Sequence, residues 1–145
     1  MEVLELYAVV VEAVEGDKEV PGEAVTWLAE AIFLNAMTGT PVEEALGLKM
    51  PGSTSRTIRY QYLQRLRDEA ILEAWKGTAG ATPWEKSQNL SRHIERFEFG
   101  QVIRGFREAA NDIESALDRA FDTEIRMPTT PEGVNAIVQR KLDNN

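Results

Sequence analysis

A threonine stands directly before a proline at three places, Thr40-Pro41, Thr82-Pro83 and Thr130-Pro131. The threonine hydroxyl can accept from a free N–H of a first helical turn, where a proline at the next position loses no hydrogen bond. Glu43 and Glu85 follow their threonines by three residues, which completes a capping box. The pairs therefore predict three helix starts. Thr-Pro is also the pattern of proline-directed phosphorylation, but the glutamates favour caps.

Apolar residues recur at helical spacing through most of the chain, and strand and hairpin signals are nearly absent. The sequence therefore predicts an all-α fold, a compact bundle of about six or seven helices. The expected helices cover residues 3–15, 22–37, 41–46, 55–76, 83–98, 111–121 and 131–142. For 3–15 the β-branched valines leave a strand as the alternative. On the second of these helices, the face expected to point inward carries Val25, Leu28, Ile32 and Ala36.

One stretch, Gly77-Thr78-Ala79-Gly80-Ala81, has the composition of a linker. It divides the chain into lobes of residues 1–78 and 82–145. Short helices need each other's faces for burial, so we expect a single all-α domain over 1–145 with these two lobes.

Composition narrows the class of protein further. The chain of 145 residues has no cysteine and a net charge of −8. Disulfides and thiolate chemistry are thereby excluded. The apolar run 6–11 lies between Glu5 and Glu12 and is too short for a signal peptide or a membrane span. We expect a cytoplasmic protein that does not enter a membrane.

The residues give little support to catalysis. His93 is the only histidine, so it cannot build a zinc or di-iron site with another histidine. Serine-nucleophile and phosphate-loop patterns are missing from the sequence. The carboxylates Glu114, Asp118 and Asp122 follow one another at i, i+4 spacing, as on a solvated helix face. We expect a protein that is not an enzyme and uses no cofactor or metal.

Charge is sorted along the chain. Residues 1–44 contain ten acids and one base, and residues 45–67 contain five bases and no acid. These blocks carry net charges of −9 and +5. Such asymmetry indicates where a charged partner could dock.

The basic segment 49–67 is the candidate site. A loop of small residues leads into a helix whose N-terminus combines arginine with threonine and tyrosine, side chains suited to phosphate oxygens and to base stacking. The residues expected to contact nucleic acid are Lys49, Arg56, Arg59, Tyr60 and Arg67.

The run from Val42 to Leu48, followed by a turn and Ser55 to Tyr60, resembles a helix-turn-helix, with the whole motif near 41–70. That resemblance implies DNA binding. The run differs from the usual motif because Gly47 and Ile58 are eleven positions apart, more than a tight turn needs. The same stretch resembles small helical proteins of proteobacteria and phages, which implies a mobile-element origin.

We therefore expect a helical interaction or regulatory protein, with four alternatives for the charged segments. The basic segment could contact nucleic acid, or it could pair with the acidic N-terminal third. That acidic third could instead bind a basic protein partner, as an adaptor or as an inhibitor that imitates nucleic acid. The fourth alternative is a structural subunit that forms homo-oligomers.

Overall fold

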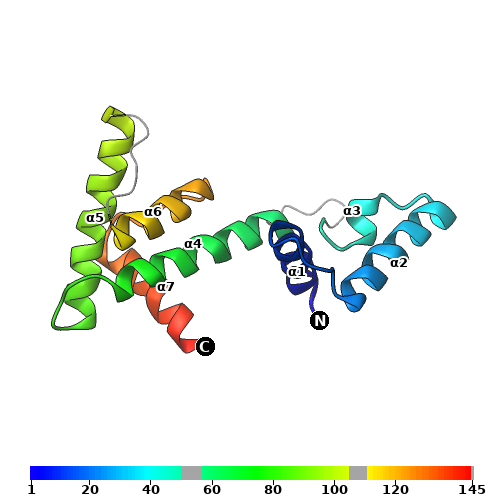
Figure 1. The fold of residues 1–145 in the computed structure, drawn as a ribbon, viewed down its shortest axis with the longest axis horizontal. Helices are drawn as coiled ribbons and strands as arrows, with labels where there is room; N and C mark the ends of the chain where they lie inside the picture. Colours follow the sequence, from blue (N-terminus) through cyan, green and yellow to red (C-terminus); the bar gives the residue numbers. More distant parts are fainter. Residues whose placement is uncertain (50–56, 105–110, 145) are drawn as a thin grey trace. The chain divides into compact units, whose positions relative to one another are not determined.

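The computed structural model describes residues 1–49, 57–104 and 111–144, and within these ranges it contains seven helices and no strand (Figure 1). The predicted all-α class is confirmed. The helices are α1 (Val3–Glu15), α2 (Gly22–Thr38), α3 (Val42–Ala45), α4 (Ile58–Lys76), α5 (Pro83–Arg104), α6 (Asp112–Asp122) and α7 (Pro131–Asp143).

The chain divides into two compact units, Met1–Tyr62 and Leu63–Asn145, so the boundary falls within α4. The linker-like stretch at residues 77–81 does not form this boundary, because it packs within the second unit. Thr78 is 3% exposed, and its hydroxyl donates to the Ala74 carbonyl at 2.7 Å. The amide of Asn89 donates to the carbonyl of Ala79 at 2.8 Å.

Side-chain caps start three helices of the second unit. The Thr82 hydroxyl accepts from the N–H of Glu85 at 3.1 Å, and the Thr130 hydroxyl accepts from the N–H of Gly133 at 3.1 Å. The Asn111 side chain caps α6 by accepting from the N–H of Glu114 at 2.9 Å. Each cap satisfies a donor that a helix N-terminus would otherwise leave without a partner.

The third expected threonine cap is wrong. The Thr40 hydroxyl shares a hydrogen bond of 2.7 Å with the Thr38 hydroxyl, and no side chain caps α3. The cause is the end of α2 just before it. Gly39 adopts a left-handed conformation there, with φ of 73°, and the turn brings the two threonines together.

The second unit has a core of large aliphatic side chains. The C-terminal half of α4 lies among α5, α6 and α7 (Figure 1), and its residues join theirs in one hydrophobic cluster. The fully buried members include Ile71, Leu90, Ile94, Leu117, Val134 and Val138. The buried members on α5 and α7 lie at helical spacing, because each of these helices has a single amphipathic stripe that faces the core.

A buried carboxylate links two helices of this unit through hydrogen bonds. Asp68 is 4% exposed, and one of its oxygens accepts from Nε and Nη2 of Arg67 at 2.9 and 2.6 Å. The other oxygen accepts from Nη2 of Arg140 on α7 at 2.6 Å. Arg67 also donates from Nη1 to the carbonyl of Arg126 at 2.7 Å. Two helices and the segment before α7 are thus joined at one point.

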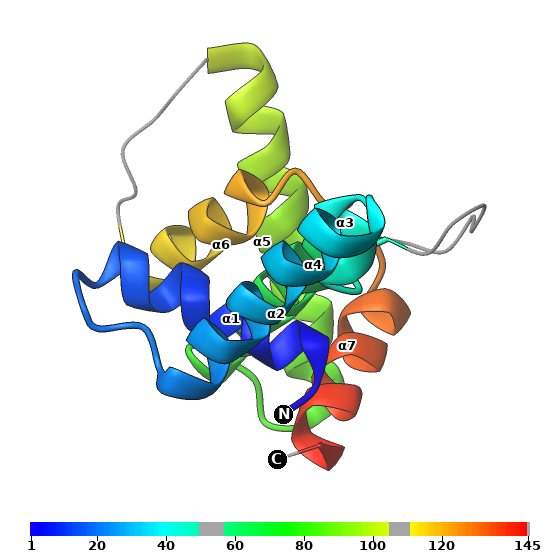
Figure 2. The same cartoon turned by 90° about the vertical axis from the view of Figure 1, so that its right-hand side faces the viewer.

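The first unit is built differently, because its interior consists mainly of small side chains. α1 packs on α2, and α3 lies beside α2 (Figure 2), where the indole N–H of Trp27 donates to the Leu46 carbonyl at 3.2 Å. The rings of Tyr7 and Tyr62 meet edge to face, with centroids 5.5 Å apart. The buried residues of α1 and α2 are Leu6, Ala8, Ala13, Ala24 and Ala31.

The predicted inward face of α2 is wrong for three of its four residues, and only Leu28 is half-buried. Val25 and Ile32 are 50% and 62% exposed, and Ala36 is exposed as well. Alanines fill the opposite side of the helix. Small buried side chains permit a close approach of packed helices, and Val25, Ile32, Phe33 and Met37 remain outside.

Replacing Asp68 by asparagine should destabilise the second unit by about 3–5 kcal/mol, because it leaves the Arg67 charge buried without a counter-charge. The measurement is the urea midpoint followed by tryptophan fluorescence in a Trp27→Phe background, so that the signal comes from Trp75 and Trp84 of the second unit. Glu73→Gln is the control. It breaks an exposed pair with Arg119 and should cost under about 1 kcal/mol. Equal losses in the two variants would contradict this ranking.

Candidate functional site

Two of the five predicted nucleic-acid-binding residues stand at the surface. Lys49 and Arg59 are exposed, and among the residues that the structure describes neither has an ion-pair partner. Arg56 lies outside the described residues. The turn of the helix-turn-helix-like segment lies there too, so the motif stays a prediction.

Tyr60 is half-buried at the first turn of α4, where its backbone N–H donates to the Thr57 hydroxyl at 3.2 Å. A half-buried ring offers less surface for stacking on a base than an exposed one. The structure thus weakens the expected combination of arginine and tyrosine on one open face.

Arg67 must be removed from the predicted site. Arg67 is only 8% exposed, and its guanidinium donates hydrogen bonds to the Asp68 carboxylate and to the carbonyl of Arg126. A guanidinium whose donors are already used inside the protein has none to offer a phosphate. The counter-charge is the next residue of its own helix, and not a carboxylate of the acidic N-terminal third.

A surface that the sequence analysis missed lies on α2. Six apolar side chains, all exposed, follow one another at intervals of four, three, one, three and one residues, which places them on one face of the helix. We call this face the α2 stripe; it consists of Val25, Ala29, Ile32, Phe33, Ala36 and Met37.

The large members of the α2 stripe are strongly exposed. Phe33 and Met37 are 66% and 68% exposed, and Ile32 is 62% exposed. Single exposed apolar residues are ordinary, but a contiguous row of them is a candidate interaction surface. The sequence does contain a signal for this surface, because α2 is apolar on two sides. One side carries Ala24 and Ala31, and the other side carries the bulky residues of the α2 stripe.

Carboxylates are also exposed in the acidic N-terminal third. Glu12 and Glu15 lie on α1, and Asp17 and Glu19 follow in the connection to α2. All four are exposed. This arrangement leaves the negative charge of the segment available to an outside partner.

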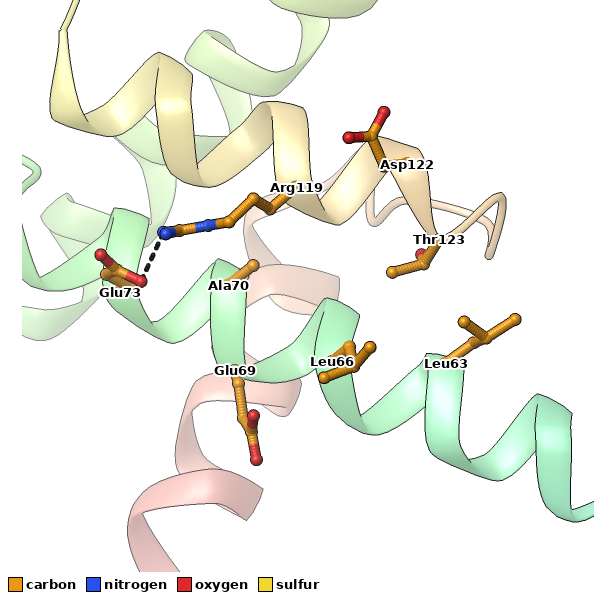
Figure 3. A pocket seen from close by; sticks show the side chains of 8 residues that line it. All are labelled: Leu63, Leu66, Glu69, Ala70, Glu73, Arg119, Asp122 and Thr123. Atoms are coloured by element: carbon orange, nitrogen blue, oxygen red, sulfur yellow. Dashed lines mark hydrogen bonds and ion pairs between the residues drawn. The ribbon is translucent and has the colours of Figure 1, made fainter. Parts of the chain in front are cut away.

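The second unit has a hollow of about 370 Å³ between α4 and α6. Figure 3 shows Leu63, Leu66 and Ala70 along its α4 wall, and Arg119 on α6 reaching toward Glu73 at one end. The Arg119 Nη2 to Glu73 Oε2 distance is 2.5 Å. The α4 wall of the hollow is therefore apolar. The Arg119 guanidinium already pairs with Glu73 of the same unit. Both features disfavour the binding of a charged ligand in this hollow.

The pKa of one carboxyl on α6, that of Asp118, depends on its surroundings. Partial burial raises the pKa of the Asp118 carboxyl above its ordinary value, and the charge of Asp122 raises this pKa further. The folded protein therefore holds this proton more readily than the unfolded chain. Above the raised pKa, Asp118 is ionised in both states, and its charge lowers the free energy of unfolding. This loss of stability disappears as the pH falls below 3.8, the ordinary pKa of the carboxyl in the unfolded chain.

Asp118→Asn should therefore raise the stability of the second unit at pH 7, because the amide cannot ionise. The gain should vanish at about pH 3, where the unfolded carboxyl is protonated too. Urea midpoints of the parent and the variant at the two pH values measure this difference. A variant that is less stable than its parent at pH 7 would contradict the direction of the shift.

The described part of the chain contains no group of three or more histidine, aspartate or glutamate side chains that could hold a metal ion. His93 is half-buried beside a smaller hollow of about 290 Å³, which Arg96, Phe97 and Glu114 also line. Over the same residues, no helix combines the length and the apolar character that crossing a membrane requires.

Comparisons of the chain with known protein families, curated proteins and solved structures find no match. Inference about function therefore depends on the surfaces described above.

Proposed function

We propose that this chain is a non-enzymatic protein-interaction module, whose first unit binds a helical segment of a partner through the α2 stripe. The observation that carries the proposal is the exposure of four large apolar side chains on one helix. Val25, Ile32, Phe33 and Met37 are each half exposed or more. Helical partners are recognised through anchors at this spacing.

The inverted packing of α2 supports this role. A helix gains most by burying its large side chains, yet α2 buries Ala24 and Ala31 and exposes Ile32 and Phe33. Fully burying a large apolar side chain stabilises by about 1.5–3 kcal/mol. Covering the exposed halves of the four large residues would contribute about 4–7 kcal/mol before the cost of association is subtracted. The apolar side chains of the partner helix bury a similar area, so the gross gain of roughly 8–14 kcal/mol offsets the cost of association and leaves a weak complex.

A neutral amphipathic peptide tests the proposal without knowledge of the natural partner. The probe is an 18-residue peptide of leucine and glutamine, with leucines at i, i+3, i+4 and i+7, labelled for fluorescence anisotropy. The full chain should bind it with a Kd of the order of tens of micromolar. Ile32→Gln combined with Phe33→Gln should weaken binding at least about tenfold, because it removes two central anchors.

The matched control is Val14→Gln. Val14 is 69% exposed on α1, so this change removes an equally exposed apolar side chain outside the α2 stripe. It should leave the affinity for the peptide unchanged. A double variant that binds the peptide as well as its parent does would refute the proposed docking face.

Contact with nucleic acid is a second candidate, which the exposure of Lys49 and Arg59 favours. Lys49→Ala with Arg59→Ala should then reduce the slope of log affinity against log salt by about 2 for a labelled 20-base-pair duplex. The control removes the exposed bases Lys76 and Arg92 of the second unit, with the same change in net charge. Equal effects of the two double variants would count against a site at 49–67.

A further inference from the structure

We infer that the partner segment at the α2 stripe is a basic amphipathic helix, with lysine or arginine along one edge of its apolar face. The inference rests on the proposed function and names the chemistry of its partner. It is carried by the placement of charge on α2, because the apolar side chains alone do not distinguish one amphipathic helix from another.

The charges of α2 lie along one edge of the α2 stripe. The helix carries two acids, Glu23 and Glu30, and no base. Glu30 precedes Phe33 by three residues, so it lies beside Phe33 on the helix surface, and Met37 lies on the same side two turns further along. Glu23 precedes Glu30 by seven residues, which places the two carboxylates in one line.

Glu30 is available to an outside cation. Glu23 accepts a hydrogen bond from the N-terminal amine of Met1 at 3.2 Å, with its side chain 59% exposed. Glu30 is exposed, and within the described ranges no cation pairs with it. A lysine or arginine facing this edge would gain a partner that the protein itself does not supply.

The surrounding charge has the same sign. The segment 1–44 carries a net charge of −9, and the exposed Glu12, Glu15, Asp17 and Glu19 lie close before α2 in the sequence. This field attracts a positive segment and speeds its association. A second copy of the chain would bring the same carboxylates, and Glu30 would meet like charge. The charge pattern therefore favours a basic partner over self-association.

The length of the α2 stripe sets the size of the partner segment. Positions 25 to 37 span about 18 Å along a helix at 1.5 Å per residue. A partner helix of three to four turns covers that length. Its apolar residues should recur at i, i+3, i+4 and i+7, with the basic residues beside them.

The experiment compares three labelled 18-residue peptides with leucine at the same positions and lysine, glutamine or glutamate at the others. Binding to the full chain is measured at low and at physiological salt. The lysine peptide should bind roughly tenfold more tightly than the glutamine peptide at low salt, and the glutamate peptide more weakly than both. The preference for lysine should shrink as salt rises.

Two neutralised variants locate the charge that causes this preference. Glu23→Gln with Glu30→Gln should lower the preference for lysine at low salt by about threefold and leave the affinity for the glutamine peptide unchanged. The control is Glu95→Gln with Glu98→Gln, which neutralises two exposed acids of α5 and alters net charge equally. If both variants lower lysine-peptide binding alike, the edge of the α2 stripe does not select the partner, and the inference falls.

Peroxide oxidation reports whether the peptide lies on the α2 stripe. Met37 is 68% exposed, whereas Met127 is 6% exposed and serves as an internal reference. The lysine peptide should slow the oxidation of Met37 relative to the chain alone. Unchanged oxidation of Met37 in a saturated complex would place the peptide elsewhere and overturn the inference.

The outcomes separate this inference from the proposed function. Equal binding of all three peptides, lost in the Ile32→Gln and Phe33→Gln double variant, would overturn the basic partner and keep the docking face. Binding of every peptide that is indifferent to that variant would overturn both. Sedimentation equilibrium that shows a dimer, lost in the same variant, would assign the α2 stripe to a second copy and overturn the basic partner.

Discussion

Asp68 is a carboxylate inside the second unit with both of its oxygens occupied, one by Arg67 and the other by Arg140. Its position on α4 lets it hold α7 and, through Arg67, the carbonyl of Arg126. A buried charge of this kind is stable only while every partner is in place, because desolvation costs several kcal/mol per ion. The packing of α4 among α5, α6 and α7 must therefore satisfy this network as well as fill the hydrophobic core.

The helices were predictable because their signals are local. The caps at Thr82, Asn111 and Thr130 depend on residues three positions away, and the sequence displays that spacing directly. The inward face of α2 was not predictable in this way. Two sides of that helix are apolar, and the choice between them depends on how closely α1 approaches, which small alanines permit and periodicity does not reveal.

At the candidate site, too, features set by neighbouring residues could be predicted and those set by distant residues could not. Counting charges identified a basic segment, and Lys49 and Arg59 are indeed exposed. Counting could not show that Arg67 is buried, because its carbonyl acceptor is at Arg126, 59 positions away. The α2 stripe was missed for the opposite reason: three of its residues, Val25, Ile32 and Ala36, were assigned to the core, where apolar side chains ordinarily belong.

An interior of alanines also affects how the molecule opens. Burying a methyl group contributes far less than burying isoleucine or leucine, so the interface between α1 and α2 has little to lose on separation. The core of the second unit, in which Ile71, Ile94 and Leu117 are 0% exposed, loses much more burial energy when it opens. Backbone amides of α1 and α2 should therefore exchange with deuterated solvent through small local openings, well before those of α5 and α7. Heat or denaturant should melt such a chain in stages, so that no single all-or-none transition describes it.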